Sequence, residues 1–240
     1  VATVVATNML GCNHDGSAVV AASSMMARWG GIHEDEAPTL YHVPGTISSP
    51  LVQTLLELGC ECVSVKTLTF PELKLPSHLA INPMGTSPAF TDGDVHVWES
   101  SGILTHLLER YDTDHKLHPP AGSKKRIKFL QLQSFILATV YPFVASLFLH
   151  TLKPPAAQDA GYVASGKVRW AESLAPVLAA ALGDKPYLLG DELSAVDLLL
   201  AKPLRNADSL GVLAAFPMLE ALFRRVEALP SYSPAYAPKA

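Results

Sequence analysis

Apolar and polar positions show no regular pattern over the first 38 residues, and the pattern becomes regular only from Thr39 onward. A short helix is expected at 17–29, and the acidic cluster 34–36 followed by Pro38 predicts a linker. Short β-like runs and amphipathic runs then alternate, before purely helical periodicity takes over. The pattern divides the chain into an extension at 1–38, an α/β unit at 39–112, an all-helical unit at 121–232 and a tail at 233–240.

The α/β unit is predicted to follow the order β-α-β-loop-β-β-α. Strands are expected at 39–43, 61–66, 89–91 and 95–98, and the turn Asp92-Gly93-Asp94 predicts that the last two form a hairpin. Ser48, Ser49 and Pro50 favour a helix start, and Gly59 favours its end. A second helix is expected from Ser100 to Tyr111, and 71–83 is expected as a loop with at most one helical turn.

The C-terminal unit shows helical spacing throughout. Helices are expected at 123–152, 156–182, 194–210 and 216–228, the first of them bent at Pro142. No charged residue occurs between Lys128 and Lys153, and that length is enough to cross a bilayer. Polar residues such as Gln133 and Ser134 are spread along the run, so a helix buried between neighbours and a dimer partner is the better interpretation.

Composition narrows the class of protein. The chain has 240 residues, of which 49% are hydrophobic and 17% charged, which is typical of a globular protein. The net charge of −4 and the lack of a dense basic stripe argue against a nucleic-acid binder.

The three cysteines, Cys12, Cys60 and Cys62, are too few and odd in number for a disulfide framework. They favour a reducing compartment: the cytoplasm, or an organelle stroma or matrix if 1–38 is what remains behind a cleaved targeting peptide. Cys60 and Cys62 have no second cysteine pair nearby, so a zinc site is not expected. Small buried residues on a strand are the expectation for this pair.

The segment Leu40–Gly59, LYHVPGTISSPLVQTLLELG, leads from a strand through a Ser-rich turn into an amphipathic helix. A helix N-terminus offers unpaired N–H groups and positive potential, and a thiol becomes a good nucleophile only when ionised. A hydroxyl beside that terminus can hold a thiolate. The segment resembles the strand, Pro-Gly turn and helix of glutathione transferases, and this resemblance implies Ser48 as the first candidate for the catalytic donor, with Ser49 and Thr46 as alternatives. On this segment alone, plain capping of the helix by Ser48 is the better interpretation.

Two further segments complete the pattern. They are Asn82–Tyr111, NPMGTSPAFTDGDVHVWESSGILTHLLERY, and Tyr187–Leu204, YLLGDELSAVDLLLAKPL. In the second, Ser194 and Asp197 have the spacing of a capping box, with Leu193 and Leu198 as a hydrophobic staple. The three segments together, in this order and spacing, resemble the glutathione transferase family over 39–232, about four fifths of the chain.

The resemblance implies a thioredoxin-like glutathione-binding domain followed by an all-helical domain. It implies that Pro88 follows a cis peptide bond, that the backbone of Ser87 pairs with the cysteinyl part of glutathione, and that Glu99 and Ser100 receive its γ-glutamyl end. Many relatives carry Lys where this chain has Thr86, which implies a neutral hydrogen bond to the glycyl carboxylate, with His78 or Lys74 as possible substitutes. Cysteine-using relatives would place their Cys near Ile47, so disulfide reductase chemistry of that kind is not expected.

Two functions are compatible with this pattern. In the first, the chain conjugates glutathione, as co-substrate, to a small apolar electrophile, with no bound cofactor or metal. An apolar wall drawn from Phe135, Tyr141, Phe143 and 232–236 would face that electrophile. In the second, it is a non-catalytic module of a larger protein assembly. The resemblance also implies a homodimer with the long helix at its interface.

Overall fold

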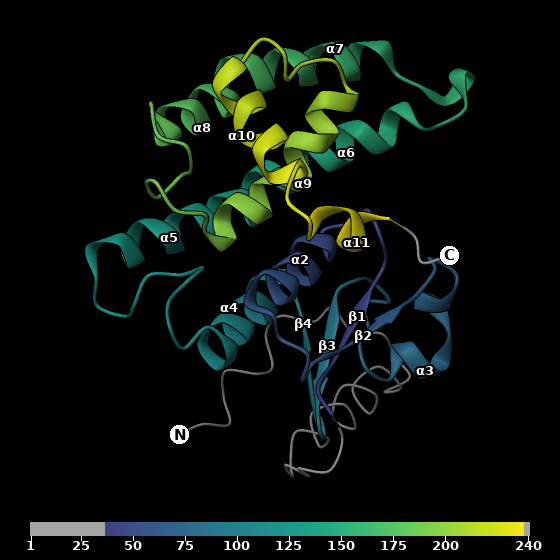
Figure 1. Cartoon of the computed structure of the whole chain (residues 1–240). Coiled ribbons are helices and arrows are strands. Elements are labelled where there is room, and N and C mark those ends of the chain that lie inside the picture. Colours follow the sequence, from purple (N-terminus) through teal and green to yellow (C-terminus); the bar gives the residue numbers. More distant parts are fainter. Residues whose placement is uncertain (1–36, 238–240) are drawn as a thin grey trace, which may run out of the picture.

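The computed structural model describes residues 37–237. The helix expected at 17–29, Cys12 and nearly all of the extension 1–38 lie outside these residues. Figure 1 shows two halves, a sheet with α2 and α4 on one side of the molecule and a group of helices on the other.

The N-terminal half is built on a four-stranded mixed sheet with the order β2-β1-β3-β4. Its strands are β1 (Thr39–His42), β2 (Ser64–Thr67), β3 (Ala89–Asp92) and β4 (Val95–Trp98). β1 pairs in parallel with β2 and antiparallel with β3, so that Leu40 lies opposite both Val65 and Phe90. β3 and β4 form the expected hairpin. This is the thioredoxin-like arrangement that the sequence predicts.

Two amphipathic helices pack against this sheet, α2 (Ser49–Leu58) and α4 (Ser100–Tyr111). Gly59 ends α2 in the left-handed conformation, with φ 63°, as its position predicts. Two details differ from expectation. β2 begins at Ser64 instead of residue 61, and 71–83 holds a 3-10 turn, Glu72–Lys74, as well as the one-turn helix α3 (Pro76–Leu79).

The C-terminal half is entirely helical. Its helices are α5 (Lys124–Phe135), α6 (Tyr141–Thr151), α7 (Ala160–Arg169), α8 (Ala175–Leu182), α9 (Ala195–Ser209), α10 (Pro217–Glu227) and α11 (Tyr232–Tyr236). A short 3-10 turn, Pro155–Ala157, precedes α7. Two π-helical segments, Ile136–Val140 and Trp170–Leu174, join α5 to α6 and α7 to α8.

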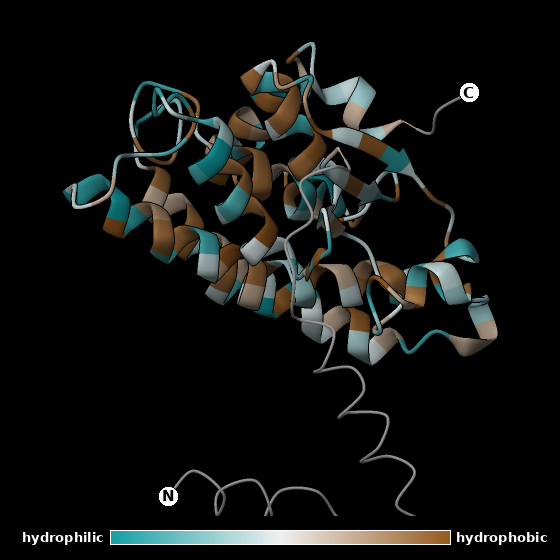
Figure 2. Cartoon of the chain, turned by 90° about the horizontal axis from the view of Figure 1, so that it is seen from below, coloured by the Kyte–Doolittle hydropathy of each residue, from teal (hydrophilic) through white to brown (hydrophobic). Residues whose placement is uncertain are grey.

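The expected long helix at 123–152 is continuous but irregular in the middle. Pro142 has no N–H to donate to the preceding turn, and the helix widens over 136–140, just before it. Among the described residues, Lys124–Thr151 is the helix whose length and composition would suit a membrane span. Its Phe129, Ile136 and Val144 are buried in the protein core, and 33% of its most apolar stretch is buried. The helices alternate apolar and polar stretches in Figure 2.

α9 is the central element of the helical half, because it packs against α2, α6 and α10 and most of its residues are buried. Its start is the predicted capping box of Ser194 and Asp197. The Asp197 carboxylate accepts hydrogen bonds from the backbone N–H of Ser194 at 2.9 Å and of Leu188 at 2.8 Å, and from the Ser194 hydroxyl at 2.5 Å. Burial raises the pKa of Asp197 to about 6, so the carboxylate is still ionised at pH 7.

A buried carboxylate also fixes the connection between the halves. Asp112 accepts hydrogen bonds from the backbone N–H groups of Lys116, Leu117 and His118 at 2.7, 2.8 and 3.0 Å, and lies 2.6 Å from Nδ1 of His118. The carbonyl of Leu117 in turn accepts the N–H of Ala195, the first residue of α9, at 2.8 Å. The polar segment expected as a linker is therefore an anchored loop.

The end of the chain is more ordered than a tail. Tyr232, Ala235 and Tyr236 are buried, and α11 packs on α2 between the two halves (Figure 1). The prolines and serines of this segment predict no helix. Only three of its residues are buried apolar positions, and three positions are too few to reveal a helical period. Tertiary packing on α2 supplies the stability that local propensity does not.

Replacing Asp112 by Asn should lower the free energy of unfolding at pH 7 by about 3 kcal/mol, because the buried His118 ring and three N–H groups lose their anionic acceptor. Burial works to raise the pKa of Asp112, but the hydrogen bonds from His118, Leu117 and Lys116 outweigh it and hold the pKa below its ordinary value. The stabilisation is therefore complete above about pH 4 and lost as the pH falls through the lower folded-state pKa.

Urea unfolding at pH 7 and pH 3 measures this difference. Asp114→Asn, at an exposed aspartate in the same loop, is the matched control and should change stability little at either pH. An Asp112→Asn deficit that is as large at pH 3 as at pH 7 would contradict the assignment.

Candidate functional site

A cleft of about 390 Å³ lies between the two halves. Loops and helix starts of the N-terminal half form one wall, and the middle of the long helix forms the other. The lining residues are Ile47, Thr86, Ser87, Pro88, Glu99, Ser100, Ser101, Ser134, Leu137, Ala138, Tyr141 and Pro142. The cleft thus brings together the five residues expected to bind glutathione: Thr86, Ser87, Pro88, Glu99 and Ser100.

The loop from Asn82 to Pro88 is shaped by one buried amide. Nδ2 of Asn82 donates to the carbonyl of Thr86 at 2.9 Å and to its hydroxyl at 3.2 Å, while Oδ1 accepts the N–H of Met84 at 3.0 Å. The peptide bond between Ser87 and Pro88 is cis, as predicted. The hydroxyl of Ser87 accepts the N–H of Val43, which ties the loop to the end of β1 at 3.1 Å.

α4 begins at the cleft. Glu99 precedes it with φ 80°, a conformation that is unfavourable for a residue with a side chain and is found preferentially at functional sites. Glu99 is exposed, whereas Ser100 is largely buried although it lines the cleft. No side chain caps this helix. Its first N–H groups and positive dipole end are therefore suited to an anionic group such as a carboxylate.

The three expected catalytic hydroxyls do not line the cleft. Oγ of Ser48 is buried and lies 2.7 Å from Nδ1 of His42, 2.8 Å from Oγ1 of Thr46 and 3.1 Å from the carbonyl of Val43. Oγ of Ser49 accepts the N–H of Gly45 at 2.9 Å, and Oγ1 of Thr46 donates to Val43 at 2.7 Å.

The backbone conformation of Ser48 directs its hydroxyl away from the cleft. Ser48 already has helical backbone angles, and its Oγ lies against the backbone and side chain at the end of β1. The expectation that Ser48, Ser49 or Thr46 faces a thiol is not met by this geometry. These side chains stabilise the turn into α2, and Ile47 is the residue of that turn that lines the cleft.

Tyr141 supplies the hydroxyl that the turn does not. It lines the cleft from the start of α6, and its phenol lies close enough to the backbone N–H of Ile47 for that group to act on its pKa. Burial raises the pKa of Tyr141, and the Ile47 N–H offsets part of that rise. At neutral pH the phenol therefore keeps its proton and can donate it in a hydrogen bond into the cleft.

The other side chains expected in an apolar wall pack elsewhere. Phe135 and Phe143 lie against the hydrophobic core, and Tyr232 and Tyr236 of α11 are buried. His78 is buried, with Nε2 3.1 Å from the carbonyl of Thr86, and the Lys74 ammonium donates to the carbonyl of Gly85 at 2.8 Å. Both support the loop, and neither lines the cleft.

Comparison with known proteins agrees with this architecture. The family profile described as glutathione S-transferase, N-terminal domain, matches residues 37–109, and the C-terminal domain profile matches 140–230. Glutathione S-transferase 3 of Zea mays is 31% identical over 208 residues, which cover 80% of this chain and 90% of the maize protein. The chain belongs to the glutathione S-transferase family.

Solved structures show the same fold. The glutathione transferase URE2P6 from Phanerochaete chrysosporium, in complex with oxidized glutathione, superimposes with a TM-score of 0.74 over 84% of this chain and 96% of its own, at 21% identity. A theta class glutathione S-transferase from Xanthomonas axonopodis with glutathione bound gives 0.70 over 85% of this chain and 98% of its own, at 22% identity.

Sequence reasoning found the half of the site that comes from local motifs and missed most of the helical wall. Ser134, Leu137 and Ala138 carry no motif, and only their helical spacing from Tyr141 could have grouped them. Ser101 follows Ser100 on α4. Gln133 donates to the hydroxyls of Ser101 and Thr105 at 2.9 and 3.0 Å, which joins the two walls.

Within residues 37–237 no group of three or more His, Cys, Asp or Glu side chains is placed to hold a metal.

Replacing Asn82 by Ala should lower the free energy of unfolding by about 1–3 kcal/mol, because it leaves the buried groups that Asn82 pairs without partners. Thermal unfolding followed by circular dichroism measures the loss. Met84→Ala, which truncates an exposed side chain of the same loop, is the control and should change the melting temperature little. If the two variants have the same melting temperature, Asn82 does not organise this loop.

Proposed function

We propose that this chain binds glutathione in the cleft between its halves, holds the thiol as a thiolate, and transfers it to an apolar electrophile. One observation supports the proposal above the others: the start of α4, the Ser87–Pro88 cis bond and the Tyr141 hydroxyl all border the same cleft. They match, in chemistry, the carboxylate, the peptide backbone and the sulfur of glutathione.

The γ-glutamyl end fits the start of α4. Ser100 and the first N–H groups of the helix receive the carboxylate, and the exposed Glu99 carboxylate attracts the ammonium. The backbone of Ser87 pairs with the cysteinyl residue in the manner of an added strand. Thr86 offers a neutral donor to the glycyl end, because its hydroxyl only accepts from Asn82 and keeps its own proton. A neutral donor implies weaker binding than a lysine would give.

The thiolate is stabilised by the N-terminal end of α2 together with the hydroxyl of Tyr141 on α6. The sulfur lies near Ile47, at the positive end of α2, where an anion is favoured. Tyr141 keeps its phenol proton at neutral pH and donates it toward the sulfur. Leu137 and Ala138 give the electrophile an apolar surface. The thiolate attacks the electrophilic carbon, a C–S bond forms, and the leaving group departs with the electron pair of its bond.

A second candidate function is a non-catalytic glutathione transferase-like module within a larger assembly. The observation that favours it is that Ser48 and Ser49 are fully buried and hydrogen-bonded to the turn, so neither is available to a thiol. The fold is compatible with both candidates.

Retention on immobilised glutathione and conjugation of glutathione to a chloronitrobenzene separate the two candidates. We expect the wild type to bind and turn over. Ser100→Ala should lose retention, because the carboxylate loses its hydroxyl donor, whereas Tyr141→Phe should be retained while kcat falls about 10- to 100-fold.

Ser48→Ala is the control for this experiment and should affect stability more than turnover. Loss of turnover in folded Ser48→Ala with full turnover in Tyr141→Phe would overturn the assignment of Tyr141. Neither retention nor turnover by the wild type, with co-purification in a stable assembly, would support the module.

We further expect a homodimer that uses the exposed apolar side chains of β4 and α5. Ile127 is 72% exposed and Leu130 43% exposed on α5, and Val95 and Trp98 are exposed on the edge strand β4. Sedimentation at micromolar concentration should show a dimer for the wild type and a monomer for Ile127→Glu. Val177→Glu, at an exposed apolar position of α8, is the matched control and should remain dimeric. A monomeric wild type would refute this expectation.

A further inference from the structure

Two cysteines meet at the far end of α2 from the cleft. The sulfur atoms of Cys60 and Cys62 are 3.1 Å apart, with Cys60 partly buried and Cys62 exposed. This differs from the expectation of buried residues on a strand, because β2 begins only at Ser64 and both cysteines precede it. α2 has ten residues, so about 15 Å of helix separates the pair from the turn at Ile47.

The backbone holds the two thiols together. On one side, Gly59 closes α2 and the N–H of Cys60 donates to the carbonyl of Leu55 at 3.0 Å. On the other side, Val63 is buried and the N–H of Ser64 donates to the carbonyl of Pro38 at 2.8 Å. A disulfide bond is about 2.05 Å long, so the sulfur atoms need to close by only about 1 Å. Both flanks are fixed, and the segment between them is short.

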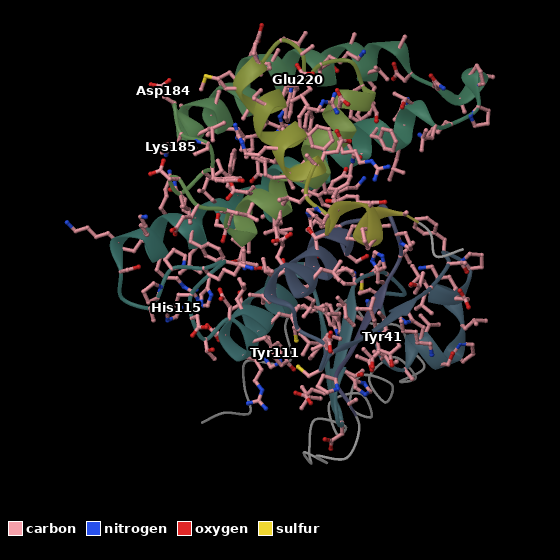
Figure 3. All side chains as sticks on the ribbon, viewed as in Figure 1. Tyr41, Tyr111, His115, Asp184, Lys185 and Glu220 are labelled. Carbon is pink, nitrogen blue, oxygen red and sulfur yellow. The ribbon has the colours of Figure 1, made fainter. Side chains whose placement is uncertain are left out.

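The two thiols have different environments. Burial raises the pKa of Cys60, the neighbouring Cys62 raises it further, and the backbone N–H groups of Cys62 and Val63, which donate to its sulfur, act in the opposite direction. Cys62 is the accessible thiol. Tyr111, which Figure 3 labels on α4, is a further titratable group close to the pair. The exposed thiol is thus placed to react first and the partly buried thiol to react second.

We propose that Cys60 and Cys62 form a redox-active dithiol that exchanges with small-molecule disulfides at a site separate from the cleft. The Cys62 thiolate attacks one sulfur of the disulfide, forms a mixed disulfide and releases the first thiol. The Cys60 thiolate then attacks the Cys62 sulfur, the Cys60–Cys62 bond forms and the second thiol leaves. The two cysteine protons end on the two released thiols, and the small disulfide takes up the two electrons that the dithiol loses.

The second step is favoured by what the first step changes. Once Cys62 is bonded, it no longer raises the pKa of Cys60, while the two backbone N–H groups remain and stabilise the Cys60 thiolate. The ring that closes spans only three residues, so the bond removes little entropy from the unfolded chain. It is therefore reversible by thiols, which suits exchange better than structural support.

The test uses the full chain in a Cys12→Ser background, because Cys12 is the one other cysteine. The protein is incubated with hydroxyethyl disulfide, the reaction is quenched with an alkylating reagent, and the mass of the intact protein is measured by mass spectrometry. We expect the background protein to lose two hydrogens and keep no adduct. Cys60→Ser should hold one stable adduct on Cys62, because the resolving thiol is missing. Cys62→Ser should react at least about tenfold more slowly.

The proposal fails if the background protein keeps one adduct on each cysteine, remains a dithiol, or forms disulfides between chains. Equal rates for the two single variants would also overturn it. Hydroxyethyl disulfide has no γ-glutamyl group, so its reaction does not depend on the glutathione site. Glutathione disulfide should give the same products, and a protein that fails to bind glutathione in the cleft would still show this exchange.

Discussion

The joint between the two halves is governed by one constraint: backbone groups removed from water must find partners within the protein. Two buried carboxylates provide such partners by accepting hydrogen bonds from backbone N–H groups: Asp112 at the end of α4 and Asp197 at the start of α9. They are connected, because the loop that Asp112 folds presents the Leu117 carbonyl to the first N–H of α9. The orientation of the sheet relative to the helices, and hence the cleft between them, follows from this chain of hydrogen bonds.

The cleft has two walls of different origin. The wall from the N-terminal half is made of backbone features, the cis bond before Pro88 and the start of α4, which depend on a few local residues. The wall from the long helix is made of side chains, and its Tyr141 lines the cleft together with Ile47 from the opposite wall. The first wall therefore depends on residues close in sequence, whereas the second depends on how the long helix packs against the N-terminal half.

Much of this could be predicted from the sequence, and the limits have physical causes. The β3–β4 hairpin, the start of α4 and the Ser194–Asp197 box depend on residues close in sequence, so their motifs are visible. The cis bond was implied by the family resemblance. The orientation of Ser48 could not be predicted, because the backbone angles of the residue before α2 decide whether its side chain faces β1 or the cleft. Tyr141 meets Ile47 only through tertiary packing, and α11 is helical only because α2 covers it.

The π-helical segment at 136–140 has a consequence for how such a site can change over evolution. A π turn holds one residue more than the α-helical turn it replaces, and each residue advances a helix by about 100°. Because the wider turn takes up this extra residue, deleting one residue there would restore a regular helix and leave α6, with Tyr141 at its start, facing nearly the same direction. The helix can therefore gain or lose a single codon at this point without turning Tyr141 out of the cleft, so evolution is freer to change the length of the chain here than the residue at position 141.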